Sequence, residues 1–364
     1  MDGFSARIRQ PGIIGIFIIW LLEIGTVLLQ LADTWTWDFW IADTGDEYHI
    51  YFLKASKIYH SPDGRKDLIR NPDGRHTRTS VGHAVSRDLF NWKICDDAME
   101  PSEDDAFDDL ATWTGSVVKG PDALWYMFYT GISYREGGLV QRIGLATSKD
   151  LYKWEKRKDF QPLAADSRLY EKLGESTWPN ETWRDPWVFA DPEGGWHMFI
   201  TARAKTGVDD DRGVVGHAYS IDLLNWEIQA PLSEPGSGFG DLEVTQLSVM
   251  DGRPVLLFSC LAREFSLVRR SAGDAGGGKG GVWAVPCESI TGPFDILNAK
   301  LITDDQLYSG RLVQAHDSQW MFLAFANDDD TGNFVGHLAD PLSASWQTDG
   351  TLALKDLAGP QLVV

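Results

Sequence analysis

The sequence predicts an all-β protein, a five-bladed β-propeller whose four-stranded antiparallel blades surround a central pocket. Two observations carry this prediction: a motif that recurs five times at intervals of 55 to 72 residues, and a strand-like run ahead of each copy. Repeated units that cannot bury both faces alone pack radially, and propellers have about four to eight blades. No long helical pattern interrupts the repeats.

The clearest copies of the motif run from a glycine through a Ser-x-Asp-Leu turn to a tryptophan. Three clear and two degenerate copies are Gly82–Trp92, Gly144–Trp154, Gly216–Trp226, Gly281–Phe294 and Gly336–Trp346. We expect each to form a turn and an outer-strand anchor, with a structural role. His83, His217 and His337 share one position of the repeat. Such positions lie far apart around a propeller, so we expect hydrogen-bonded blade histidines and no shared metal site.

The run ahead of each copy is rich in apolar and aromatic residues, which is typical of a β-strand. The five runs are Tyr48–Leu53, Trp125–Thr130, Trp196–Ala202, Val255–Cys260 and Trp320–Ala326. Gly, Pro, Asn and Asp cluster between them, as turns require. We therefore expect about four short strands per unit and a single propeller domain over residues 33–364.

The segment before this domain, residues 1–32, is apolar. Arg7 and Arg9 precede an apolar stretch over residues 12–32 that Glu23 interrupts. Charge followed by an apolar run is typical of a signal peptide, and the stretch is long enough to span a bilayer, although a carboxylate near its middle is costly there. A soluble extension of a cytoplasmic protein is the interpretation we favour. Secretion or anchoring through residues 7–32 stays open, and membrane contact is expected only if residues 12–32 act as an anchor.

The composition narrows the class of partner. The formal net charge of −20 disfavours nucleic acid and acidic membranes, because like charges repel. It is compatible with an uncharged small-molecule or oligosaccharide substrate. Cys95, Cys260 and Cys287 are far apart and show no Cys-x-x-Cys spacing, which argues against a disulfide framework or a zinc site. We expect no metal and no cofactor.

Three acidic residues, Asp38, Asp185 and Glu243, break the repeat near the start of a unit. Their surroundings are Trp35–Trp40, Trp183–Trp187 and Gly240–Gln246. Burying a carboxylate among aromatic side chains is costly unless it has a partner or a function. The structural alternatives are a turn aspartate, an ion-paired core aspartate and a solvated edge glutamate. Arg184 is adjacent to Asp185, so in an extended strand their side chains would point in opposite directions.

The first strands of all blades converge on the axis of a propeller. Acids on the first strands of units one, three and four would therefore meet in one central pocket. A pair of carboxyl groups flanking a glycosidic bond is the usual machinery for its cleavage. The sequence thus points to a glycoside hydrolase.

The residues around these acids resemble glycoside hydrolase families 32 and 68, one clan of fructosyl-active five-bladed propellers. The segments that carry the resemblance are Trp35–Trp40 with Asp46–Phe52, Trp113–Ser116, Arg184–Pro186, and Glu243 ahead of Asp251–Ser259. The Arg-Asp-Pro motif is intact. The Asn and Pro beside the family 32 nucleophile and the Cys-Pro after its acid are replaced, so we expect a divergent member.

The resemblance implies a retaining hydrolase of fructosyl linkages in sucrose, fructooligosaccharides or fructans, acting through a fructosyl-enzyme intermediate. Asp38 would be the nucleophile and Glu243 the acid/base. Asp185, assisted by Arg184, would hold sugar hydroxyls and stabilise the transition state. Further candidates for binding the substrate are Trp37, Trp113, Ser116 and Gln246.

Three alternatives stay open at this point. A fructosyltransferase of the same fold differs in its acceptor. An inverting arabinan or xylan hydrolase like those of family 43 would hold its two carboxyls about 6.5–9.5 Å apart, against about 5–5.5 Å for a retaining enzyme. A non-catalytic carbohydrate-binding propeller would bind sugar without turnover, since fold does not fix function.

Overall fold

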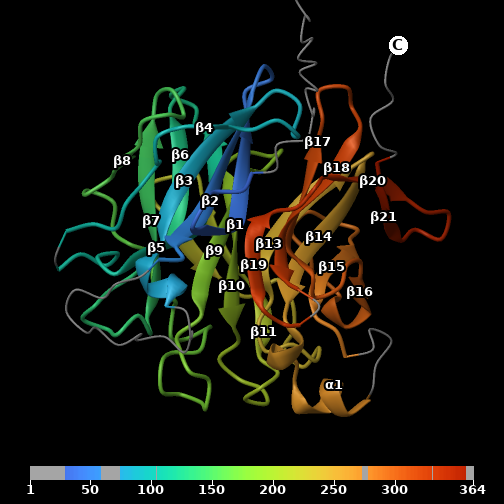
Figure 1. The fold of residues 1–364 in the computed structure, drawn as a ribbon. Coiled ribbons are helices and arrows are strands. Elements are labelled where there is room, and N and C mark those ends of the chain that lie inside the picture. Colours follow the sequence, from blue (N-terminus) through green and yellow to red (C-terminus); the bar gives the residue numbers. More distant parts are fainter. Residues whose placement is uncertain (1–28, 59–73, 104, 273–277, 330, 358–364) are drawn as a thin grey trace, which may run out of the picture.

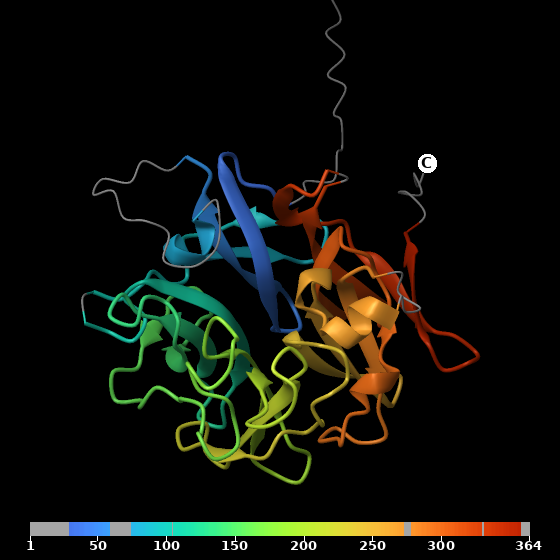
Figure 2. The ribbon, with the colours of Figure 1, turned by 90° about the horizontal axis from the view of Figure 1, so that it is seen from below.

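The computed structural model describes residues 29–58, 74–103, 105–272, 278–329 and 331–357. Their strands form five antiparallel sheets around one axis, as Figure 1 shows from the side and Figure 2 from below. The predicted five-bladed propeller is confirmed. Helices in this part of the chain are short: η1 Arg75–Arg78, η2 Ala262–Glu264, α1 Leu267–Ala272 and η3 Ile296–Asn298.

Each of the first three blades begins with its innermost strand and runs outward. Blade one contains β1 Thr34–Asp43, β2 Tyr48–Ser56, β3 Ser80–Ser86 and β4 Lys93–Ile94. Blade two contains β5 Ala111–Lys119, β6 Trp125–Ile132, β7 Gln141–Ser148 and β8 Glu155–Lys156. Blade three contains β9 Trp183–Ala190, β10 Trp196–Arg203, β11 Gly213–Ser220 and β12 Glu227–Gln229.

The last two blades complete the ring. Blade four contains β13 Glu243–Met250, β14 Arg253–Cys260, β15 Gly281–Pro286 and β16 Lys300–Leu301. Blade five contains β17 Leu307–Gln314, β18 Trp320–Asp328, β19 Phe334–Leu338, β20 Leu342–Trp346 and β21 Leu352–Asp356. Here the third strand is split, because β19 and β20 both pair with β18 on either side of Pro341. Proline has no N–H for the sheet ladder, which explains the break. Strands β17 and β19 contact β1 and close the ring.

The five predicted strand runs lie in the second strand of each blade, namely β2, β6, β10, β14 and β18. The glycine that opens the motif lies in the third strand for a steric reason. A Cβ atom at Gly82 would collide with the ring of Phe52 in β2, and one at Gly144 would collide with Phe107 and Tyr129. The missing side chain therefore lets aromatic rings pack across the blade.

The turn that follows in the motif is held by its own side chains. The Ser86 hydroxyl accepts the N–H of Leu89 at 3.0 Å, and the Asp88 carboxylate accepts the N–H of Asn91 at 2.8 Å. The Trp92 ring nitrogen donates to the carbonyl of Leu89 at 3.1 Å. The same bonds recur at Ser148–Trp154 and Ser220–Trp226. The predicted structural role is confirmed for the three clear copies of the motif.

Two of the repeat histidines also have the predicted structural role. His83 bonds to His49 at 3.0 Å and His217 to His197 at 2.9 Å, in equivalent places of blades one and three. The Nδ1 atom of His337 is buried without a hydrogen-bond partner, as is the Nδ1 atom of His83. The three cysteines are free. In the described part of the chain no cluster of His, Cys, Asp and Glu is arranged to hold a metal ion.

The predictions for the N-terminal segment fall almost entirely outside the described residues, which begin at Leu29. The signal, anchor and extension interpretations of residues 7–32 therefore stay predictions. Within the ranges that the structure describes, no helix is long and apolar enough to cross a membrane.

Candidate active site

The innermost strand of every blade carries a β-bulge at a matching position. The shifts in pairing fall at Asp38, Thr114, Asp185, Val244 and Ser309. Four of these residues have positive φ angles: 25° at Asp38, 56° at Asp185, 52° at Val244 and 51° at Ser309. A left-handed backbone is strained for residues other than glycine and is concentrated at functional sites. Because a bulge re-aims side chains, this ring of bulges marks the hub as the candidate site.

The bulges bring Asp38 of β1, Asp185 of β9 and Glu243 of β13 together. Burial raises the pKa of Asp185 to about 7, with help from the charges of Asp38 and Glu243 and against the Arg184 guanidinium. Burial also raises the pKa of Asp38, and the charge of Glu243 adds to that effect. The charge of Glu243 therefore raises the pKa of both aspartates, and the charge of Asp38 raises that of Asp185, as expected for carboxyls that share one site.

Asp38 is held from both sides by hydroxyl groups. Thr114 donates to its Oδ2 at 2.7 Å, and Ser309 donates to its Oδ1. These two bonds and the charge of Arg311 favour the ionised form of Asp38 and oppose the effect of burial on its pKa. The carboxylate is thus fixed in orientation by the bulge residues of blades two and five.

Arg184 links the other two acids, contrary to the prediction that it would point away from Asp185. Its Nη2 donates to Glu243 Oε1 at 2.6 Å and to Asp241 Oδ2 at 2.8 Å. Its Nε lies 3.5 Å from Asp185 Oδ2. That prediction was wrong because it assumed an extended strand, and the positive φ of Asp185 breaks the alternation of side chains.

Glu243 is clamped at both carboxylate oxygens. Oε1 accepts from Arg184, and Oε2 accepts the hydroxyl of Tyr308. Burial, followed by the charge of Glu243, raises the pKa of Tyr308, so the phenol keeps the proton that it donates. Nearby, burial and the charge of Glu243 raise the pKa of Glu264 to about 8. Glu243 keeps 18% of its side chain exposed, which leaves it accessible from solvent.

The two tryptophans predicted to bind the substrate, Trp37 and Trp113, both contact His76 in η1. The Trp37 ring meets the edge of Phe334 at a centroid distance of 6.2 Å and approaches His76 at 5.9 Å. Trp113 donates its ring N–H to the carbonyl of His76 at 2.8 Å. Both tryptophans precede a bulge residue directly, which places them beside Asp38 and Thr114 in the chain.

Ser116 and Gln246 connect neighbouring blades. The Ser116 hydroxyl accepts the N–H of Val188 at 3.0 Å, from blade two to blade three. The Gln246 amide donates to the carbonyl of Leu312 at 3.0 Å and accepts its N–H at 2.7 Å, from blade four to blade five. Both side chains are buried. These bonds give both side chains a structural role, and the sugar contacts predicted for them stay predictions.

Several residues of the site were missed by sequence reasoning. Thr114 and Asp241 lie inside segments that were quoted for their neighbours, so proximity to the motif residues was the available signal. Tyr308, Ser309 and Arg311 come from blade five, whose first strand contains no acid and gave no signal. Arg311 is 2% exposed and donates to the carbonyls of Val244 and Thr245 in blade four.

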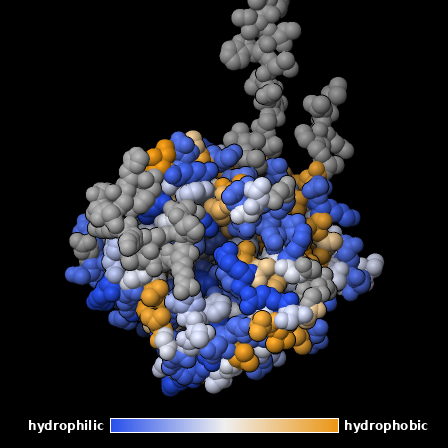
Figure 3. Space-filling model, turned by 60° about the horizontal axis from the view of Figure 1, so that its bottom comes forward, coloured by the Kyte–Doolittle hydropathy of each residue, from blue (hydrophilic) through white to orange (hydrophobic). Residues whose placement is uncertain are grey.

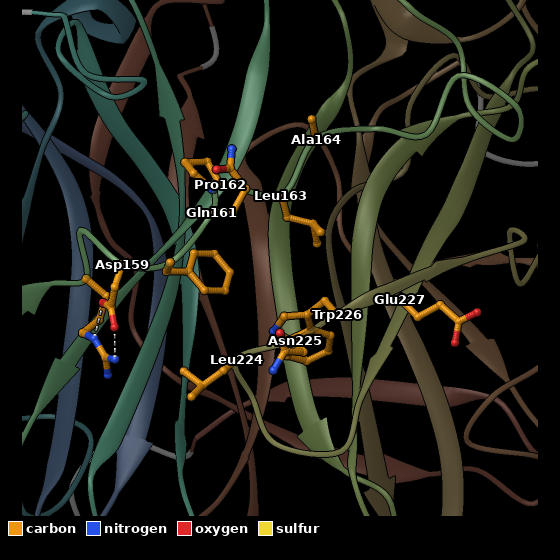
Figure 4. Close-up of a pocket in the computed structure, with 11 residues that line it drawn as sticks. Asp159, Gln161, Pro162, Leu163, Ala164, Leu224, Asn225, Trp226 and Glu227 are labelled. Carbon is orange, nitrogen blue, oxygen red and sulfur yellow. Dashed lines mark hydrogen bonds and ion pairs between the residues drawn. The ribbon is translucent and has the colours of Figure 1, made fainter.

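The surface agrees with a site at the hub. The face in Figure 3 is hollowed near its centre, where hydrophilic side chains gather. A separate cavity of about 730 Å³ lies at the outer rim and is shown in Figure 4. It is lined by residues of 157–164, after β8, and by 224–227, before and at the start of β12. None of the three acids lines this rim cavity.

Comparison with known families agrees with this arrangement of acids. The sequence model of the glycosyl hydrolases family 32 N-terminal domain matches residues 70–272, more than half of the chain. The chain belongs to glycosyl hydrolase family 32. The matched segment of this family 32 chain includes Asp185 and Glu243, and Asp38 precedes it. The resemblance identified from the motifs is confirmed.

Curated relatives of this family 32 chain are hydrolases. It is 31% identical over 186 residues to the sucrose-6-phosphate hydrolase of Bacillus subtilis (strain 168), covering 49% of this chain and 34% of the relative. It is 30% identical over 170 residues to the beta-fructofuranosidase, insoluble isoenzyme CWINV6, of Arabidopsis thaliana, covering 45% of this chain and 28% of the relative. The matches span about a third or less of these relatives' length.

Solved structures share the propeller fold. The inulosucrase from Halalkalicoccus jeotgali bound to kestose superposes with a TM-score of 0.68 at 21% identity, covering 90% of this chain and 88% of that one. At this identity the likeness shows the fold alone. Nearly the whole of that chain is covered, so the shared fold extends beyond the segment that the family model matches.

Proposed function

We propose that this chain is a retaining glycoside hydrolase that cleaves fructosyl linkages in sucrose, fructooligosaccharides or fructans. The observation that carries the proposal is the meeting of Asp38, Asp185 and Glu243 at the hub, with Arg184 in contact with two of them. The names of the curated relatives, a beta-fructofuranosidase and a sucrose-6-phosphate hydrolase, support the same chemistry.

In this proposal Asp38 attacks the anomeric carbon of the fructosyl unit. Thr114 and Ser309 each bind one oxygen of its carboxylate, which leaves lone pairs on both oxygens for the attack. Attack requires the ionised carboxylate, and the two hydroxyl donors together with Arg311 favour that form. A covalent fructosyl-enzyme intermediate results, and its hydrolysis retains the configuration at the anomeric carbon.

Glu243 supplies the proton to the leaving oxygen and then removes one from the attacking water. Arg184 and Tyr308 hold its two oxygens, so its orientation is set before substrate arrives. Asp185, beside Arg184, binds sugar hydroxyls and stabilises the positive charge that develops on the sugar ring in the transition state.

The test is incubation of the purified chain with sucrose, inulin and levan, with the products resolved by chromatography. We expect release of fructose, and an Asp38→Asn variant that loses many orders of magnitude in rate. Asp159→Asn is the matched control, because Asp159 lies at the rim cavity, away from the hub, with 69% of its side chain exposed. Inactivity on all three substrates, with arabinose or xylose released from other glycans, would contradict the proposal and favour an inverting enzyme.

A fructosyltransferase is the second candidate, and the fold likeness to an inulosucrase is the observation that favours it. The two activities differ in whether water or a sugar accepts the fructosyl unit. Products longer than the substrate, growing with sucrose concentration, would indicate transfer. Binding of sugar without turnover would instead indicate a non-catalytic propeller.

A further inference from the structure

A buried threonine connects two of the strands that carry the acids. Thr201, in β10, has no exposed surface. Its hydroxyl lies 2.9 Å from Asp185 Oδ2 and 3.1 Å from the carbonyl oxygen of Leu242, and it accepts the N–H of Val244 at 3.2 Å. Leu242 and Val244 flank Glu243 in the chain. One hydroxyl therefore touches the carboxylate of one acid and the backbone on both sides of another.

The same strand position carries a hydroxyl in the blades on either side. In blade two, Thr130 accepts the N–H of Asp185 at 3.0 Å. In blade four, Ser259 accepts the N–H of Ser309 at 3.0 Å. Each of the three hydroxyls thus fixes the bulge of the following blade. Thr201 differs from the other two, because it also bonds to the side chain of a proposed catalytic acid.

The hydroxyl of Thr201 has one hydrogen and two acceptors within reach. An ionised carboxylate is a stronger acceptor than a carbonyl, so the hydrogen points to Asp185 when that group is charged. The bond then favours the charged form of Asp185, while the Val244 N–H keeps β13 in register with it. The charged groups that also face Asp185 are Arg184, Arg311, Asp38 and Glu243.

We propose that Thr201 is a positioning residue that fixes the carboxylate of Asp185 relative to Glu243 and favours its charged form. The residue is fully buried and acts through these two acids, not on the substrate. The inference rests on the proposed function, because it assigns Thr201 a part in the same reaction.

The decisive variant is Thr201→Val, which replaces the hydroxyl by a methyl group of similar size. We expect kcat to fall about 10- to 100-fold, as for loss of a hydrogen bond to a charged group that orients a reacting centre. The acid limb of the kcat/KM profile should move up by about one pH unit, because the ionised form of Asp185 loses a donor. Thr201→Ser keeps the hydroxyl and should restore both properties.

A matched control is Ser233→Ala, which also removes a buried hydroxyl that accepts a backbone N–H, that of Val215 at 3.0 Å. This change is expected to lower the unfolding temperature and to leave the acid limb in place. If Thr201→Val does not fold, the smaller Thr201→Ala variant takes the same test.

A second measurement needs no turnover. Titration of ¹³C-labelled aspartate carboxyls by NMR, with Asp185 assigned through an Asp185→Asn variant, should show a higher pKa for Asp185 in Thr201→Val than in the wild type. Inactivity of the wild type on every fructosyl substrate would overturn the proposed function and leave this titration as the test of Thr201. An unchanged titration and an unchanged acid limb in Thr201→Val, or a Thr201→Ser variant as impaired as Thr201→Val, would overturn the inference.

Discussion

Replacing Arg184 by methionine should destabilise the fold in a way that depends on pH. Arg184 is 8% exposed and its guanidinium contacts Asp185, Asp241 and Glu243, of which the two aspartates are 3% exposed. Removing one partner of a buried ion pair costs about 3–5 kcal/mol, because the remaining charge is left unpaired. We expect a loss of that size in the free energy of unfolding of Arg184→Met near neutral pH.

The sign of the pH dependence follows from the carboxyls that remain. Without the guanidinium, the folded-state pKa of Asp185 rises further above its present value of about 7. A carboxyl whose pKa is raised by folding stabilises the native state below its unfolded pKa, about 4, and this contribution is lost as the pH rises through the folded value. The loss in Arg184→Met should therefore be largest near pH 8 and smaller near pH 5, where the buried carboxyls bind protons.

Urea unfolding followed by tryptophan fluorescence at several pH values measures this loss, provided that the slope with denaturant is unchanged. Arg157→Met is the control, because Arg157 pairs with an aspartate that is 69% exposed. Such surface pairs contribute little, so a much smaller effect is expected there. A loss in Arg184→Met below about 1 kcal/mol, or one of equal size at every pH, would refute the reasoning.

Three further predictions concern single side chains. Ser309→Ala removes a hydrogen-bond donor that favours the ionised form of Asp38, so kcat/KM should fall about tenfold or more on the acid side of the pH profile and recover as the pH rises. A loss of the same size at every pH would contradict this. Burial lowers the pKa of His217 to about 4, so its contribution to stability is complete above about pH 6.5 and is lost as the pH falls to about 4. The unfolding temperature of His217→Gln should therefore depend less on pH between about 4 and 6.5 than that of the wild type. An identical dependence in both proteins would show that His217 plays no part. Gln246→Leu should lower the free energy of unfolding by about 1–3 kcal/mol with little change in KM, whereas a raised KM at unchanged stability would support the sugar contact predicted from the sequence.

The blades could be predicted because they depend on local patterns. The alternating runs became second strands, and the Ser-x-Asp-Leu turn appears in sequence because its own side chains satisfy its backbone. The split third strand of blade five was visible only as a degenerate repeat, since its cause is a single proline, Pro341.

The three acids could be found because they stand in motifs, but the geometry around them could not. The bulges at Asp38 and Asp185 depend on contacts between neighbouring blades, such as the Thr130 hydroxyl on the Asp185 N–H. No periodicity within one strand encodes such a contact. Ser309 lies 271 residues from Asp38, and nothing in the local sequence of blade five links the two.

The most direct test of the account is to trap the intermediate on the nucleophile. The wild type is quenched in acid during turnover of sucrose, digested with pepsin and analysed by mass spectrometry. The account predicts one fructosyl unit on the peptide that contains Asp38, and none on that peptide in Asp38→Asn. A fructosyl unit on a different residue, or a first-formed product of inverted configuration by NMR, would contradict it.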